Sequence, residues 1–303
     1  MLRIGTRGSQ LALWQARFIK SEINSLFPDI QIKIEVIKTE GDKLVNSPLS
    51  EIGGKGVFVK DIEEALLNNK IDLAVHSLKD MTSVLPGGLI ISAVTKRKHA
   101  ADALVSRNNI QLEELKPGSR VGTGSLRRKA QLLYHYPWLE IVPIRGNVET
   151  RLVKLDSENL DAIILAVAGL QRMGFGDRIS QIIDTEILIP APGQGIVAVE
   201  SREEDENTNN ILSGLSDLNS KYESLLERSF LKSLGGDCNI PAGCYAKVEG
   251  KSISSIAFIS DESGNNMFTE KIIGKVSESE NLGATLFNML IENGASGLVK
   301  DIS

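Results

Sequence analysis

The chain has 303 residues, 42% of them hydrophobic and 24% charged, which are the proportions of an ordinary globular protein with room for two or three domains. Its formal net charge of −5 disfavours a general nucleic-acid-binding protein. Two cysteines and three histidines, at spacings that match no usual zinc motif, disfavour both a disulfide framework and a metal site.

No apolar run is long enough to cross a bilayer, and the first eight residues (MLRIGTRG) contain no apolar stretch of the kind found in signal peptides. We therefore expect a cytoplasmic protein without a membrane or nucleic-acid partner.

The first two-thirds of the chain alternate short apolar strands with amphipathic helices. A helix is expected over 11–27, where apolar residues follow helical spacing after Ser9, a plausible N-cap, and another over 57–68. Strands are expected at 2–5, 30–36, 72–76, 89–95, 102–106, 120–123, 139–145 and 161–167. This alternation predicts mainly parallel sheets with ligand-binding groups at the carboxyl ends of the strands.

The composition changes near residue 200, where 201–210 are polar and acidic. Two helical segments follow, the second over about 220–234. Alternating segments at 244–248, 253–259 and 267–276 and a final helix at 278–292 predict a smaller α+β domain.

Residues 121–128 (VGTGSLRR) combine a strand end, a glycine turn and a helix start. The free N–H groups of a helix start, with the hydroxyls of Thr123 and Ser125, are typical of an anion site. Arg127 and Arg128 would place two positive charges in the first helical turn, where they disfavour the helix. A bound anion would neutralise them. The alternative is a plain turn between strand and helix.

Two further strand ends have the same character. Arg145 ends one predicted strand, with Arg151 early in the next helix, and Arg7 follows the first strand just before Ser9. Because arginine binds carboxylates and phosphates in planar, bidentate fashion, three such strand ends predict a ligand with several carboxylates.

Residues 74–80 (AVHSLKD) read as a buried strand that ends near His76, leaving Lys79 and Asp80 at the ligand edge. A carboxylate among cations stays ionised, so Asp80 suits the stabilisation of a cation or the acceptance of N–H hydrogen bonds. The alternative role for Asp80 is helix capping.

Cys238 lies between Gly235-Gly236 and Pro241-x-Gly243, which predicts a loop. An accessible cysteine can act as a nucleophile, although an isolated cysteine is more often a small buried apolar residue. Residues 53–56 (GGKG) are not a P-loop, because Gly56 rather than Ser or Thr follows Lys55. We expect a mobile loop in this region of the chain, and we expect it to include Lys55 and Phe58.

In their order and number these motifs resemble those of the porphobilinogen deaminase (hydroxymethylbilane synthase) family. The resemblance rests on 7–15 (RGSQLALWQ), 53–58 (GGKGVF), 74–80, 122–128, 145–147 (RGN), 161–169 (DAIILAVAG), 192–195 (PGQG) and the Cys238 loop. It implies an α/β fold of two periplasmic-binding-protein-like domains with mixed, mainly parallel sheets, plus a smaller C-terminal α+β domain. The implied domains are 1–95 with 196–216, then 96–195, then 217–303, which carries the cysteine.

The resemblance also implies a transferase of tetrapyrrole biosynthesis. Cys238 would carry a dipyrromethane cofactor through a thioether, and four porphobilinogen molecules would be joined in turn, each losing ammonia, before hydrolysis releases hydroxymethylbilane. Asp80 would stabilise the cationic intermediates and accept pyrrole N–H bonds. The implied cofactor-binding residues are Lys79, Asp80, Thr123, Ser125, Arg127, Arg128 and Arg151, and the implied substrate-binding residues are Arg7, Ser9, Arg145 and Arg172. No metal is implied, and a monomer is expected. The alternative is a two-domain anionic-solute-binding or sensor protein, which would need no cysteine on a third domain.

Overall fold

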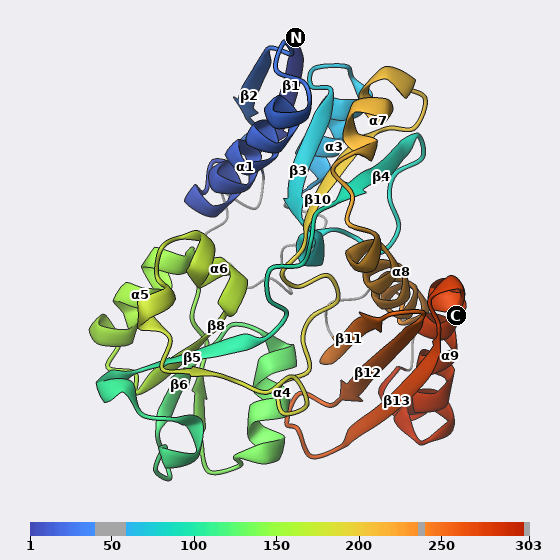
Figure 1. The fold of residues 1–303 in the computed structure, drawn as a ribbon. Coiled ribbons are helices and arrows are strands. Elements are labelled where there is room, and N and C mark those ends of the chain that lie inside the picture. Colours follow the sequence, from blue (N-terminus) through green and yellow to red (C-terminus); the bar gives the residue numbers. More distant parts are fainter. Residues whose placement is uncertain (40–58, 236–239, 300–303) are drawn as a thin grey trace. The chain divides into compact units, whose positions relative to one another are not determined.

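A computed structural model describes residues 1–39, 59–235 and 240–299 (Figure 1). The chain divides into two compact units, Met1–Lys98 with Ile196–Lys221 and His99–Gly195 with Tyr222–Ser303. The second unit contains both an α/β sheet and the C-terminal sheet. The division into three domains stays a prediction.

The first unit is built on a five-stranded sheet of order β2-β1-β3-β10-β4. β1 pairs in parallel with β2 and β3, whereas β10 pairs antiparallel with β3 and β4. Its elements are β1 (Leu2–Thr6), α1 (Gln10–Leu26), β2 (Ile32–Val36), α3 (Lys60–Leu67), β3 (Leu73–Ser77), the 3-10 helix η2 (Leu78–Asp80), β4 (Leu89–Val94), β10 (Val197–Arg202) and α7 (Glu206–Ser213).

Helix α1 covers this sheet because its apolar residues recur on one face. Ala16, Ile19 and Ile23 are fully buried and pack with Ile4 and Leu73 of the strands. The Ser9 side chain accepts a hydrogen bond from the Ala12 N–H at 3.3 Å, so it is the N-cap that the sequence predicts.

The α/β sheet of the second unit has the order β7-β6-β8-β5-β9. β6 pairs in parallel with β7 and β8, and β5 pairs antiparallel with β8 and β9. Its elements are β5 (Asp102–Ser106), β6 (Arg120–Gly122), α4 (Leu126–His135), β7 (Glu140–Val142), α5 (Val148–Ser157), β8 (Ala162–Ala166), α6 (Val167–Arg172) and β9 (Gln181–Ile182).

The two α/β sheets share one plan. In each, three parallel strands are followed by one antiparallel strand, which is β10 in the first sheet and β5 in the second, and then by an edge strand. The predicted α/β class is confirmed. Among the described residues, however, parallel and antiparallel pairings are equal in number within each sheet. In the first sheet the βαβ alternation does not reveal this, because the antiparallel strand β10 lies far along the chain from its neighbour β3. In the second sheet the antiparallel strand is β5, which precedes the other strands of that sheet in the chain.

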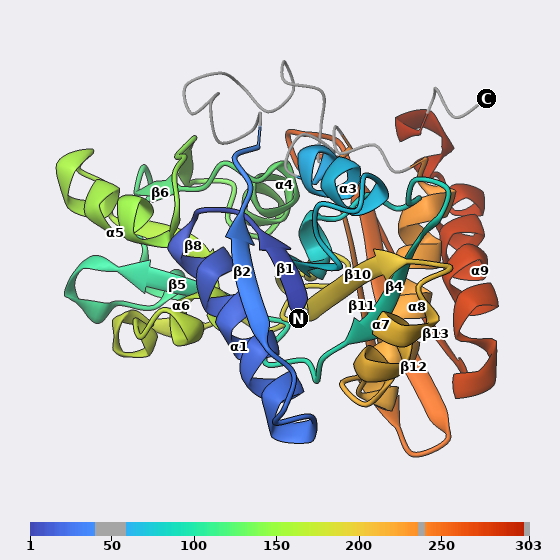
Figure 2. The same ribbon diagram turned by 90° about the horizontal axis from the view of Figure 1, so that it is seen from above.

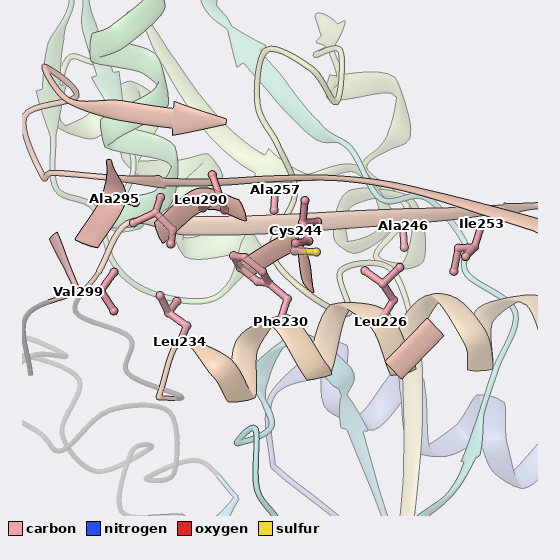
Figure 3. Close-up of a cluster of buried hydrophobic side chains, with 12 residues drawn as sticks. Leu226, Phe230, Leu234, Cys244, Ala246, Ile253, Ala257, Leu290, Ala295 and Val299 are labelled. Carbon is pink, nitrogen blue, oxygen red and sulfur yellow. The ribbon is translucent and has the colours of Figure 1, made fainter. Parts of the chain in front are cut away.

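The C-terminal part is an antiparallel sheet of order β11-β12-β13, as the alternating segments predict. Helices α8 and α9 pack against one another, since a Cβ on Gly283 of α9 would lie 2.2 Å from the Leu226 carbonyl oxygen of α8 (Figure 2). Figure 3 shows Leu226 and Phe230 of α8 pointing into the core toward Cys244. The elements are α8 (Leu218–Ser233), β11 (Ala242–Glu249), β12 (Ser252–Ser260), β13 (Met267–Lys275) and α9 (Ser279–Glu292).

Candidate active site

One edge of the first sheet gathers four of the predicted site residues. β1 and β3 are parallel neighbours, so the residues that follow them lie at the same edge. Arg7 and Ser9 follow β1, and Lys79 and Asp80 belong to η2, which follows β3 directly. All four side chains are half-buried. Asp80 is the last residue of η2. It therefore does not occupy the N-cap position that a helix-capping role would require.

The segment that carries Asp80 is anchored on both sides. The Leu78 N–H donates to the Ile196 carbonyl at 3.1 Å, and the Leu78 side chain is buried. Just before it, Ser77 Oγ accepts from Gln15 Nε2 of α1 at 2.7 Å. His76 is buried and its Nε2 lies 3.1 Å from Glu200 Oε2. Packing and hydrogen bonds therefore set the backbone that presents Lys79 and Asp80.

The corresponding edge of the second sheet contains the predicted anion site. Ser125 caps α4 by accepting from the Arg128 N–H at 3.4 Å, and the buried Thr123 accepts from the Ser125 N–H at 3.3 Å. Gly124 between them is exposed, and a Cβ there would lie 2.6 Å from the Ile144 carbonyl oxygen. The turn therefore requires glycine. Because Gly124 is exposed, the start of α4 is open to solvent.

Arg127 and Arg128 are buried, and their counter-charge is a side chain that belongs to none of the motifs above. Asp102 is fully buried, and its two carboxylate oxygens accept from Arg127 Nη2 and Arg128 Nη2, each at 2.7 Å. Burial alone would raise the pKa of Asp102, but the charges and hydrogen bonds of the two arginines outweigh it and hold that pKa well below its usual range.

The anion expected to neutralise these arginines is thus at least in part the protein's own Asp102. A charged residue at the first position of the apolar strand 102–106 was the available sequence clue. The Nε of Arg128 is also buried, and it has no hydrogen-bond partner among the described residues.

The other predicted arginines of the second unit lie near the same sheet edge. Arg145 follows β7, and Asn147 caps α5 by accepting from the Thr150 N–H at 2.8 Å. Arg151 is the fourth residue of α5. Arg172 ends α6, donates to the Gly195 carbonyl at 2.9 Å, and has its pKa lowered to about 10 by burial.

Three predicted site residues, Lys55, Phe58 and Cys238, lie outside the described residues. The cysteine that is described, Cys244, is fully buried in the C-terminal core with its Sγ 3.4 Å from Ser255 Oγ (Figure 3). Within the described ranges, no group of His, Cys, Asp or Glu residues is arranged to hold a metal ion. No described helix is both long enough and apolar enough to span a membrane.

The donors at the edge of the second sheet fit a ligand with several carboxylates, such as the acetate- and propionate-bearing rings of a dipyrromethane. They comprise hydroxyl groups, an open helix start and the buried Nε of Arg128. The half-buried guanidinium of Arg172, with its lowered pKa, would also gain from a nearby carboxylate.

Comparison with known proteins agrees with this chemistry. The family model "Porphobilinogen deaminase, dipyromethane cofactor binding domain" matches residues 2–210, and "Porphobilinogen deaminase, C-terminal domain" matches 221–292. The porphobilinogen deaminase of Trichlorobacter lovleyi is 44% identical over 99% of this chain and 96% of its own. That of Geotalea uraniireducens is 42% identical over 99% and 94%.

Among solved structures, the methionine-binding protein MetQ aligns with a TM-score of 0.47 at 15% identity, over 75% of this chain and 94% of its own. The full-length matches in sequence favour a porphobilinogen deaminase over the alternative of an anionic-solute-binding or sensor protein. The chain belongs to the porphobilinogen deaminase family of transferases.

Proposed function

We propose that this chain condenses four porphobilinogen molecules, with loss of ammonia, into hydroxymethylbilane on a dipyrromethane attached to Cys238. The observation that carries the proposal is the match of residues 2–210 to the cofactor-binding domain of the family. When bound, the dipyrromethane supplies the pyrrole carbon to which the first substrate is joined. Each condensation forms one carbon–carbon bond and releases one ammonia, and a final hydrolysis releases the product.

Asp80 is the catalytic residue in this proposal. It is half-buried at an edge of the first sheet that it shares with Arg7 and Lys79. Asp80 would accept the pyrrole N–H and stabilise the positive charge that develops on the substrate as ammonia departs. Because that charge is larger in the transition state than in the bound substrate, the interaction raises the rate rather than only the affinity.

The cationic and hydroxyl side chains would hold carboxylates. Arg128 is best supported in this role by its buried Nε, and Thr123 and Ser125 by their place at the open start of α4. We propose Lys79, Thr123, Ser125, Arg127, Arg128 and Arg151 for the cofactor and Arg7, Ser9, Arg145 and Arg172 for the substrate or growing chain.

We further propose that the enzyme works as a cytoplasmic monomer of three domains, with 217–303 as the cysteine-bearing domain. The described contacts group most of that segment with residues 99–195, which is compatible with a domain docked on its neighbour.

Intact-mass spectrometry tests the proposal. The purified protein should carry an adduct of two linked pyrroles, and brief exposure to porphobilinogen should add a ladder of single substrate units. Cys238→Ser should lack both, whereas Cys244→Ser, which changes a buried core cysteine, should retain them. A fully active protein without any adduct would overturn the proposal.

A further inference from the structure

A buried segment of the second unit, Ile189–Gly195, connects the anion-binding helix α4 with the C-terminal sheet. It contains the PGQG motif at 192–195, for which the proposed chemistry has no role. Every residue from Ile189 to Gly195 except Ala191 is buried. Gly195 has φ +89°, and a Cβ there would lie 2.3 Å from the His99 carbonyl oxygen.

One side of this segment is hydrogen-bonded to α4 and to the charge cluster at its start. The Ile189 carbonyl accepts from Arg127 Nη1 at 2.6 Å, and the Ile189 N–H donates to Gln131 Oε1 at 2.7 Å. Gln194 Nε2 donates to Asp102 Oδ1 at 2.9 Å and to the Ala100 carbonyl at 2.6 Å. Asp102 therefore accepts from Gln194 as well as from both arginines of α4.

The other side is hydrogen-bonded to the C-terminal sheet and to α8. Glu227 of α8 is fully buried, and its two carboxylate oxygens accept from different parts of the chain. Oε2 accepts from the Gly193 N–H at 2.6 Å, and Oε1 from the Ala246 N–H of β11 at 2.9 Å. The Cys244 N–H adds a bond to the Pro190 carbonyl at 3.0 Å.

These bonds form a continuous buried path from Glu227 through Gly193 and Gln194 to Asp102, and from there to Arg127 and Arg128. We propose that Glu227 and Gln194 are positioning residues for cofactor attachment, which hold α8 and β11 in register with the arginines of α4. The inference rests on the proposed function, since α8 and β11 are the elements on either side of Cys238 in the sequence. A thioether at Cys238 can form efficiently only if the carboxylates of the same ligand are held at a matching position.

The chemistry of Glu227 makes the path testable. Both of its carboxylate oxygens accept N–H bonds, whereas a glutamine has one accepting oxygen and an NH₂ that donates. Glu227→Gln therefore turns a donor toward either the Gly193 or the Ala246 N–H with little change in volume. Glu223, one turn earlier on α8, is the matched control, because its Oε1 accepts from the Val248 N–H of the same strand at 3.1 Å.

The first experiment measures the rate of cofactor attachment by intact mass after the apo protein is mixed with porphobilinogen. We expect Glu227→Gln to slow attachment at least tenfold and Glu223→Gln to change it less than twofold. Gln194→Met keeps the side-chain volume and the bonds of Glu227 but removes the donor to Asp102, and it should slow attachment to a similar degree. Normal attachment in both Glu227→Gln and Gln194→Met would overturn the inference.

The second experiment is independent of cofactor chemistry. Amide hydrogen exchange is followed in full-length protein carrying Cys238→Ser, with and without each additional substitution. Glu227→Gln should speed exchange at Gln194 and in the first turns of α4 at least tenfold, whereas Glu223→Gln should affect only α8 and β11. Gln194→Met should loosen α4 without loosening β11.

The outcomes of the two experiments separate the two proposals. Faster exchange confined to α8 and β11 in Glu227→Gln would make Glu227 a local structural residue and overturn the inference. If the wild type acquires no adduct while the exchange pattern appears as expected, the proposed function fails but the path from Glu227 to α4 stands.

Discussion

Asp102 Oδ2 and Arg127 Nη2 lie 2.7 Å apart in an interior from which solvent is almost entirely excluded, at the point where α4 begins. The pairing explains how two consecutive arginines can lie in the first turn of a helix, where the helix dipole disfavours positive charge. It also means that the start of α4 carries a net charge of about +1, from two guanidinium groups and one carboxylate, before any ligand binds.

Substitution of Asp102 should therefore be costly. Asp102→Asn leaves two buried guanidinium groups without their counter-charge, and we expect the free energy of unfolding to fall by about 3–5 kcal/mol. Asp72→Asn is the control, because Asp72 pairs with Arg3 at 2.6 Å in a partly exposed position, where the loss should be about 1 kcal/mol. Urea unfolding at pH 7 measures both. Equal losses in the two variants would show that burial does not set the strength of the Asp102 cluster.

Glu63 should make stability depend on pH. Burial, and then the charge of Glu200, raise the pKa of Glu63 to about 7, whereas its value in the unfolded chain is near 4.5. Between these values the folded state holds a proton that the unfolded state has lost, so the free energy of unfolding falls as pH rises from about 4.5 to 7. The fall is on the order of 3 kcal/mol.

Glu63→Gln should remove most of this fall, because the amide is neutral at every pH in the range. Glu64→Gln, at the exposed next position of α3, should leave the fall unchanged. Urea midpoints measured from pH 5 to pH 8 provide the comparison. A wild-type profile that matches Glu63→Gln across the range would show that Glu63 does not carry the pH dependence.

Asp80→Asn should separate binding from catalysis. The amide preserves the size of the side chain and loses the negative charge, so we expect kcat to fall by about 10²–10³-fold with KM little changed. Steady-state kinetics on protein with a complete adduct measure both parameters, with Glu64→Gln at an exposed position of α3 as the control. Wild-type turnover in Asp80→Asn would refute the charge assignment.

Gly195→Ala tests the geometry of the buried segment. The positive φ of Gly195 and the 2.3 Å approach of a Cβ to the His99 carbonyl oxygen both oppose a side chain, so a loss of about 2 kcal/mol or more is expected. Gly176→Ala is the control, because a Cβ there meets no atom within 4 Å. Thermal unfolding distinguishes the two variants. A Gly195→Ala protein as stable as Gly176→Ala would show that the segment can relax around the added carbon.

Local patterns in the sequence predicted most of the elements. The helical spacing over 11–27 corresponds to α1, and the strands predicted at 102–106 and 253–259 correspond closely to β5 and β12. The glycine turn before α4 was also predicted, because such features depend on residues within a few positions of one another. The motifs that carry the family resemblance are likewise local.

The tertiary structure decided which distant residues share a site. Asp102 meets Arg127 across 25 positions and Gln194 across 92, and β10 enters the first sheet beside β3 from more than 100 residues away. Such pairings cannot be inferred from the periodicity of the sequence. The periodicity indicates which face of an element is buried, but not which residues pack against that face. The sequence by itself therefore determined most of the elements and the arginine, lysine and hydroxyl side chains that follow the ends of their strands. Only the fold determined that Asp102 pairs with both arginines and that Glu227 is hydrogen-bonded to the segment leading to them.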